Sequence, residues 1–78
     1  MGDIEKRVKE TLSIVFEVPV SAIDKNASLH TLKGWDSLNH MKMIIALEEE
    51  FSIKMDQHEI EAMINFYIIK ATICSYLD

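Results

Sequence analysis

The spacing of apolar residues predicts that most of this chain is helical. Near the N-terminus five apolar positions recur with the period of a helix: Ile4, Val8, Leu12, Val15 and Phe16. They predict an amphipathic helix over residues 3–16, with Asp3 as its N-cap. Pro19 follows shortly afterwards, and because proline cannot continue a helix, we expect this helix to end before it.

The next segment, residues 21–35, has no sustained period and predicts a long loop. Its mixture of Ser, Asp, Asn, Lys and Gly leaves room for one short helical turn at residues 21–24. Three apolar side chains are expected to hold the loop against the core: Ile23, Leu29 and Leu32. Because long loops are uncommon in small domains, the length of this one indicates a functional role.

A second helix is predicted over residues 37–51, and it is apolar on two opposite faces. Asp36 suits its N-cap, since a carboxylate accepts the unpaired N–H groups of a first turn. One face carries Met43, Ile44, Leu47 and Phe51, and the other carries Leu38, Met41 and Ile45. A small domain cannot easily bury both faces, so we expect the second to meet a partner. The alternative is that these residues are ordinary scattered surface apolars.

Two shorter helices complete the predicted fold. After an extended connection through Ile53 and Met55, Asp56 can cap a third helix that continues to about residue 63, with Ile60 and Met63 facing inward. Asn65 can cap a last helix over residues 66–77, whose apolar positions include Ile69, Ile73 and Leu77. The pattern therefore predicts an all-α domain over residues 1–78: a small four-helix bundle with a long first loop and a short third helix.

Composition agrees with a small packed domain. The 78 residues are 49% hydrophobic, with Gly 2 and Pro 1, which is enough for a core and leaves few helix breakers. The single Cys74 excludes an intramolecular disulfide. No apolar run reaches the roughly 20 residues of a membrane span, and the charged start lacks the apolar core of a signal peptide. We therefore expect a cytoplasmic protein without a membrane span.

The net charge of −5 is concentrated in one part of the chain. Residues 36–61 contain seven acids and two bases, whereas acids and bases balance in the remainder. Nucleic-acid binding needs the opposite sign, so this role is excluded. An acidic face attracts basic partner surfaces. The alternative is a solvated face that maintains solubility.

Ser37 lies at the junction of the predicted loop and the second helix, in the run Gly34-Trp35-Asp36-Ser37-Leu38. A helix N-terminus favours a phosphate group through its dipole and free N–H groups. Leu32, the Asp-Ser-Leu triplet and the Ala-Leu-Glu-Glu-Glu-Phe run at residues 46–51 resemble the signature of acyl carrier proteins. The first helix, the Val-Pro-Val-Ser exit and the short acidic helix also fall where that family has them, so the resemblance covers nearly the whole chain.

The resemblance implies a carrier and not an enzyme. By it, a phosphopantetheinyl transferase would move phosphopantetheine from coenzyme A to the hydroxyl of Ser37, flanked by Asp36 and Leu38. The thiol of this covalent arm would carry acyl groups as thioesters for fatty-acid, lipid or polyketide-type biosynthesis. The family's interior, in which acyl chains can lodge, matches Met43, Ile44, Leu47 and Phe51.

The resemblance also implies a docking helix for partner enzymes. The matching positions are Leu38, Met41, Ile45, Glu48 and Glu49. The expected partners are an acyl ligase, ketosynthase or acyltransferase with a basic docking surface, and we expect the carrier to be a monomer.

Four positions depart from the fatty-acid type of carrier. Asn39 and Lys42 stand where that type usually has acids, Trp35 replaces a small residue, and His40 is uncommon at its position. These changes weaken the negative charge beside Ser37 and predict a specialised, discrete carrier with its own set of partners.

Two other functions share part of this pattern. A peptidyl or aminoacyl carrier has the same fold and serine arm, although glycines more often precede its serine. A helical docking module would use Leu38, Met41 and Ile45 without any modification.

Catalytic and metal-binding interpretations are weaker. Ser37 and His40 are three residues apart on a helix, but a hydrolase also needs an orienting acid, an oxyanion hole and a pocket. Asp24, Asn26 and Ser28 fit the start of a calcium loop, whose sixth and twelfth positions here are Leu29 and Trp35 instead of Gly and Glu. Further, His30, His40 and His58 do not share a zinc-ligand spacing, so we expect no metal site.

Overall fold

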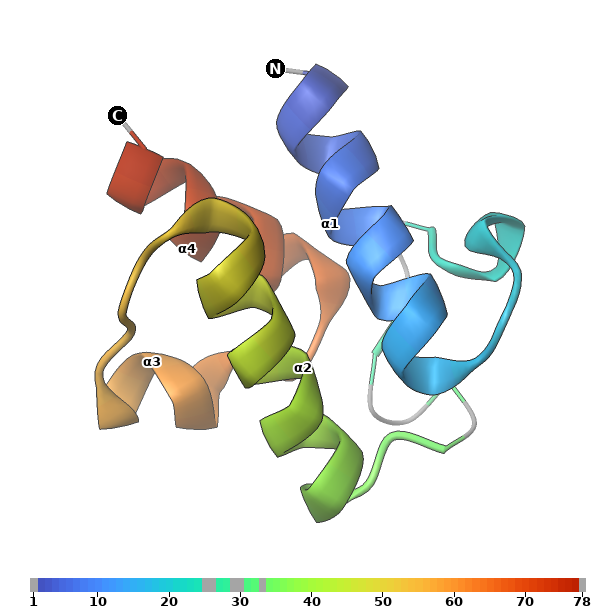
Figure 1. Cartoon of the computed structure of the whole chain (residues 1–78). Helices are drawn as coiled ribbons and strands as arrows, with labels where there is room; N and C mark the ends of the chain where they lie inside the picture. Colours follow the sequence, from blue (N-terminus) through green and yellow to red (C-terminus); the bar gives the residue numbers. More distant parts are fainter. Residues whose placement is uncertain (1, 25–26, 29–30, 33, 78) are drawn as a thin grey trace.

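The computed structural model describes residues 2–24, 27–28, 31–32 and 34–77, and it confirms the predicted all-α fold. The helices and one short 3-10 turn follow the chain in this order (Figure 1): α1 Gly2–Phe16, η1 Val20–Ala22, α2 Ser37–Phe51, α3 Gln57–Ala62 and α4 Phe66–Leu77. The turn η1 overlaps the short helical turn expected in the first loop. No helix in the described ranges combines the length and the apolar character needed to cross a bilayer.

The ends of α1 differ slightly from the prediction. The helix begins at Gly2, so Asp3 lies in its first turn and is not the N-cap. It ends because Glu17 adopts a left-handed conformation with φ 56°, which allows the N–H of Val18 to donate to the carbonyl of Ser13 at 3.1 Å. The helix therefore stops before Pro19, as the residue preceding a proline favours.

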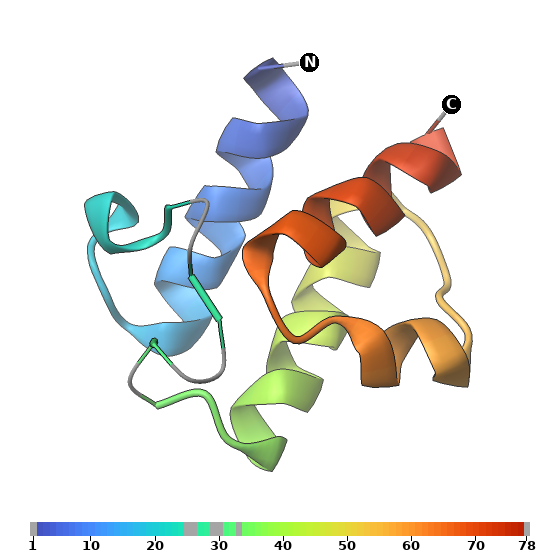
Figure 2. The same ribbon diagram turned by 180° about the vertical axis from the view of Figure 1, so that it is seen from behind.

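The helices are arranged so that Ser37 and the chain termini lie at opposite ends of the molecule. Figures 1 and 2 show α2 running from its start at one end towards the end where the two termini lie. The α1 helix packs against both α2 and α4. The short α3 runs crosswise between α2 and α4 and lies on the side of the molecule near the start of α2 (Figures 1 and 2).

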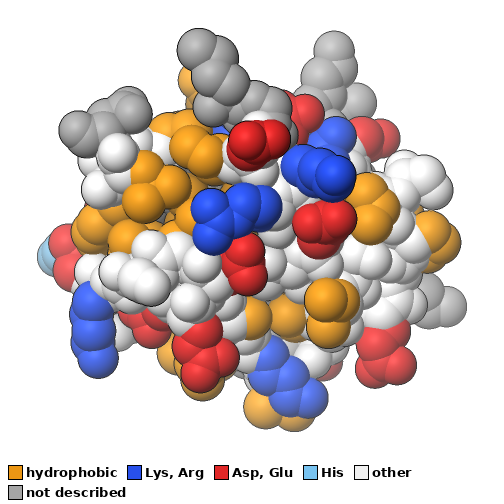
Figure 3. Space-filling view, turned by 45° about the horizontal axis from the view of Figure 1, so that its top comes forward, with side chains coloured by type: hydrophobic (Ala, Val, Ile, Leu, Met, Phe, Trp, Pro, Cys, Tyr) orange, Lys and Arg blue, Asp and Glu red, His pale blue; other side chains and the backbone are white. Residues whose placement is uncertain are grey.

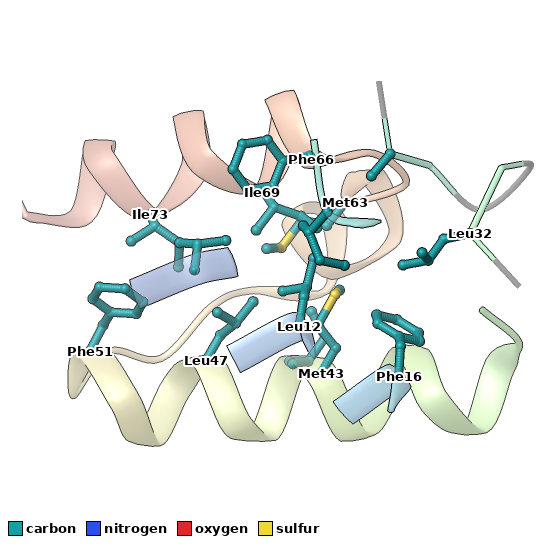
Figure 4. Packing of buried hydrophobic residues seen from close by; sticks show 14 of the residues in the cluster. Leu12, Phe16, Leu32, Met43, Leu47, Phe51, Met63, Phe66, Ile69 and Ile73 are labelled. Atoms are coloured by element: carbon teal, nitrogen blue, oxygen red, sulfur yellow. The ribbon is translucent and has the colours of Figure 1, made fainter. Parts of the chain in front are cut away.

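The core is built from the inner faces of all the long helices. The four residues predicted for the inner face of α2 are buried. Figure 4 shows three of them, Met43, Leu47 and Phe51, meeting side chains from α1 and α4. Met63, Ile69 and Ile73 are each 0% exposed, and Ile60 packs partly buried against the same cluster. Of the loop residues expected to reach the core, Ile23 and Leu32 are buried, whereas Leu29 lies outside the described residues.

Polar caps fix the shorter helices as the sequence predicts. Asp56 and Glu59 form a reciprocal capping box at the start of α3. The Oδ1 of Asn65 accepts the N–H of Ile68 at 2.8 Å at the start of α4. The long first loop is joined to this junction, because the N–H of Phe66 donates to the carbonyl of Ala27 at 2.9 Å.

Candidate functional site

Ser37 is the first residue of α2, and its side chain is exposed at the corner where the loop becomes the helix. Asp36 is the N-cap, as predicted: its Oδ1 accepts the N–H of Asn39 at 2.8 Å. The carbonyl of Asp36 accepts the N–H of His40 at 2.8 Å, which is the first hydrogen bond of the helix ladder. Asp36 therefore fixes the backbone on both sides of the serine.

The first turn of α2 leaves two backbone donors beside the serine hydroxyl. The N–H groups of Ser37 and Leu38 lie in the first turn, where no carbonyl one turn earlier can accept them. Together with the positive end of the helix dipole, they favour an anionic group at this corner. The chemistry of the corner therefore fits a phosphate attached to the Ser37 oxygen.

The loop before Ser37 is held in place by side chains from α2. Gly34 has φ 91°, a conformation that residues with a Cβ rarely adopt. Its carbonyl accepts the Nδ2–H of Asn39 at 2.7 Å and the N–H of Asp36 at 3.0 Å. The corner is thus preformed by local hydrogen bonds that do not involve the Ser37 side chain.

His40 joins the loop to α3 through both nitrogens of its ring. The Nε1–H of Trp35 donates to His40 Nδ1 at 3.0 Å. His40 Nε2 lies 2.7 Å from the carbonyl oxygen of Ile60. Because an indole N–H can only donate, Nδ1 is the acceptor, and the proton on Nε2 is donated to Ile60. We call this arrangement of Trp35, His40 and the Ile60 carbonyl the indole–imidazole bridge.

The bridge also reaches the backbone of α3 and rests on the core. Ile60 lies in the last turn of α3, and its carbonyl accepts the N–H of Met63 at 3.4 Å in addition to the proton on His40 Nε2. On the other side, the rings of Trp35 and Phe16 are 5.0 Å apart between centroids, so the indole packs on the end of α1. Side chains and backbone from the loop, α1, α2 and α3 therefore meet at this point.

A shallow groove of about 470 Å³ lies beside Ser37, between α2 and α3. Its apolar lining consists of Trp35, Met41, Ile60 and Ile64. Its polar lining consists of Asp36, Ser37, His40, Gln57 and Glu61. The candidate attachment serine thus opens onto a mostly apolar surface within the size range of ligand sites.

The outer face of α2 is as exposed as the sequence predicts. Leu38, Met41 and Ile45 are 66%, 45% and 54% exposed. Glu49 is also exposed, but Glu48 is only half-exposed, and its Oε2 accepts the N–H of Met55 at 2.9 Å. Glu48 therefore holds the connection between α2 and α3, a structural contact that the sequence did not reveal.

Three side chains with shifted pKa values lie outside this site. The ion pair with Lys70, at 2.7 Å, lowers the pKa of Glu5 and raises that of Lys70. The hydrogen bond that Tyr76 donates to Glu59 raises the pKa of Tyr76 to about 12. These contacts join α1 to α4 and α3 to α4, so they belong to the scaffold that positions α2.

The structure also bears on the catalytic and metal-binding interpretations. Both ring nitrogens of His40 are engaged by Trp35 and Ile60, so this imidazole is not free to act as a base toward Ser37. Within the described residues, no group of three or more His, Cys, Asp or Glu side chains could hold a metal ion. Asn26 and Leu29 of the calcium-loop interpretation, and His30, fall outside those residues.

A small helical fold that presents an exposed serine at a helix start, next to a shallow groove, is the arrangement that a carrier domain needs. The family model described as "Phosphopantetheine attachment site" matches residues 6–63. The chain is 33% identical over 63 residues to the acyl carrier protein of Buchnera aphidicola subsp. Schizaphis graminum (strain Sg), covering 81% of this chain and 80% of that protein. It is 36% identical over 61 residues to the acyl carrier protein of Buchnera aphidicola subsp. Acyrthosiphon pisum (strain Tuc7), covering 78% and 76%.

This chain therefore belongs to the acyl carrier protein family. Its prosthetic group is a covalently attached phosphopantetheine. The resemblance inferred from the Asp-Ser-Leu triplet and the acidic run after it is thus confirmed at the level of the family.

Proposed function

We propose that this protein carries acyl groups as thioesters on a phosphopantetheine arm attached to Ser37, and that it is not itself a catalyst. The observation that supports this most directly is the exposed Ser37 hydroxyl on a preformed corner at the start of α2. When bound, the arm supplies a terminal thiol. The chain's own contribution is to hold the serine oxygen outward and to offer the N–H groups of Ser37 and Leu38 to the phosphate.

The attachment step follows from this arrangement. In the complex with a phosphopantetheinyl transferase, the Ser37 oxygen forms a bond to the phosphorus that carries pantetheine. The bond from that phosphorus to the adenosine bisphosphate part of coenzyme A breaks, and adenosine bisphosphate leaves. The hydroxyl proton passes to a base of the transferase. Asp36 keeps the serine oriented through its two hydrogen bonds to the first turn.

We further propose that α2 is the docking helix for the transferase and for the enzymes that load and use the acyl group. Leu38, Met41 and Ile45 form an exposed apolar row opposite the core, and an amphipathic helix of this kind fits an apolar groove on a partner. Glu49 is exposed beside the row, and Glu48 lies partly exposed next to it. Such acids favour partners with a basic rim, such as an acyl ligase, a ketosynthase or an acyltransferase.

We also propose that this carrier works with a specialised set of partner enzymes. The pathway that it serves is proposed to be fatty-acid, lipid or polyketide-type biosynthesis. Lys42 is exposed on α2, and Asn39 and His40 are occupied in holding the loop. The docking helix therefore presents less negative charge near Ser37 than the fatty-acid type does. If the modified protein supported elongation by a host's general ketosynthase as well as the housekeeping carrier does, this specialisation would be refuted.

The decisive experiment is intact-mass measurement after incubation with coenzyme A and a promiscuous phosphopantetheinyl transferase. We expect the mass to increase by one phosphopantetheine in the wild-type protein and in Ser21→Ala, a matched control at another exposed serine. Ser37→Ala should gain nothing. If several transferases leave the wild-type mass unchanged, the protein acts instead as an unmodified docking module.

A further inference from the structure

We infer that the acyl cargo of this carrier lies in the outer groove beside Ser37 and not in the core, because the indole–imidazole bridge closes the way between them. This inference rests on the proposed attachment at Ser37. It concerns where the cargo is held and which cargo the site accepts, and three sets of observations on the described residues support it.

The first set of observations concerns the position of His40 on α2. His40 lies one turn after Ser37, and the buried Met43 and Ile44 lie one turn further along the same side of the helix. A chain that leaves Ser37 and enters between α2 and α3 therefore meets His40 before it reaches the core. Figure 4 shows Met43 within the core cluster, and both Met43 and Met63 are 0% exposed.

The second observation is the short distance between His40 and Ile60 in the indole–imidazole bridge. His40 Nε2 and the Ile60 carbonyl oxygen are 2.7 Å apart. A methylene group needs about 3.5–4.0 Å to the atoms on each side of it, so a hydrocarbon chain cannot pass while this bond is made. Breaking the bridge would deprive the Trp35 indole and the His40 imidazole of these partners, which opposes opening.

The third is the chemistry of the groove. Met41 and Ile64 are 45% and 40% exposed, so covering them with an apolar acyl group removes apolar surface from water. Asp36 and Glu61 also line the groove, whereas the described residues of its lining include no Lys or Arg. The groove therefore favours a neutral, apolar acyl group over one that ends in a carboxylate.

The methionines and the single tryptophan provide a direct test. The protein is loaded with butanoyl or octanoyl pantetheine by a transferase and the matching acyl-coenzyme A, and intact mass confirms loading before any spectrum is recorded. NMR then follows the methionine methyl groups and the Trp35 indole N–H. We expect octanoyl to shift Met41 and Trp35 relative to the form carrying the arm alone, with Met43 and Met63 unmoved.

Other outcomes would overturn the inference. Shifts at Met43 and Met63, with contacts from the acyl chain to their methyl groups, would place the cargo in the core. An absence of shifts at all four residues would place it in solvent. A failure to load would refute the proposed attachment instead, so the two failures are distinguishable by mass.

Variants of the bridge test its role as the barrier. In His40→Ala, which removes both hydrogen bonds, octanoyl should move to the core and shift Met43 and Met63. Trp35→Phe keeps an aromatic ring and the His40–Ile60 bond, so the cargo should stay in the groove. His58→Ala, at an exposed histidine of α3, is the matched control and should behave as the wild type. If His40→Ala is folded by circular dichroism and its cargo remains at Met41, the bridge is not the barrier.

Discussion

Tyr76 illustrates how a single contact on the scaffold responds to pH. Its phenol donates a hydrogen bond to Glu59, and this bond raises the pKa of Tyr76 to about 12. Because this value exceeds the ordinary 10.0, the neutral phenol stabilises the folded state below about pH 10. That contribution is lost as the pH rises from about 10 to about 12. We expect NMR titration of the Tyr76 ring to show the raised value directly.

Glu59→Gln is the variant that isolates this effect. Glutamine can still serve the capping box at the start of α3, so the helix should be retained, but the charge that holds the phenol proton is removed. The pKa of Tyr76 should then fall toward 10.0. An unchanged titration midpoint in Glu59→Gln would show that burial and the charge of Asp56, and not the Glu59 carboxylate, raise the pKa of Tyr76.

At the level of the element, the two faces of α2 have different roles. The buried face stabilises the fold, and the exposed face is the proposed docking surface. Ile44 and Ile45 are adjacent and chemically identical, yet Ile44 is 1% exposed and Ile45 is 54% exposed. We expect Ile44→Ala to lower the free energy of unfolding by about 2–5 kcal/mol, because it leaves a cavity in the core. Ile45→Ala should change it by no more than about 0.5 kcal/mol. Chemical denaturation of both variants measures the two values.

The same pair tests the docking surface. Ile45→Ala should lower kcat/KM for the transferase while the free energy of unfolding is kept. Ile44→Ala, measured well below its unfolding transition, should retain kcat/KM, because its side chain does not reach the surface. Equal kcat/KM values for Ile45→Ala and the wild type would show that the exposed apolar row does not contact the transferase.

At the scale of the whole molecule, the sequence was sufficient for the helices, except for the N-cap of α1, but not for the contacts between them. The two faces of α2, its Asp36 cap and the Asp56 and Asn65 caps follow from local spacing and cap chemistry, and all are observed. The indole–imidazole bridge was not predicted, because His40 and Ile60 are 20 residues apart and their contact depends on where α3 packs. Likewise, the sequence predicts that Glu48 is a surface acid. The structure shows that its carboxylate also accepts the N–H of Met55, a contact that depends on the path of the chain after α2.

The distribution of charge over the molecule predicts how the rate of association with partners depends on salt. The described ion pairs Arg7–Glu50, Lys9–Glu5 and Lys70–Glu5 all involve the first half of α1, near the end where the termini lie. Figure 3 shows Lys and Arg interspersed with acids on the face toward that end. Such pairing reduces the long-range field there.

The exposed acids Glu49 on α2 and Glu61 on α3 should therefore steer basic partners toward α2. Stopped-flow measurement should show the association rate with the transferase falling by about tenfold or more as salt is raised, because the Debye length is only about 10 Å at 0.1 M. Lys42→Glu on α2 should raise the rate at low salt. Lys6→Glu, in the first half of α1, changes the net charge equally but should alter the rate less. Equal effects of the two variants would mean that net charge alone, and not its position, governs encounter.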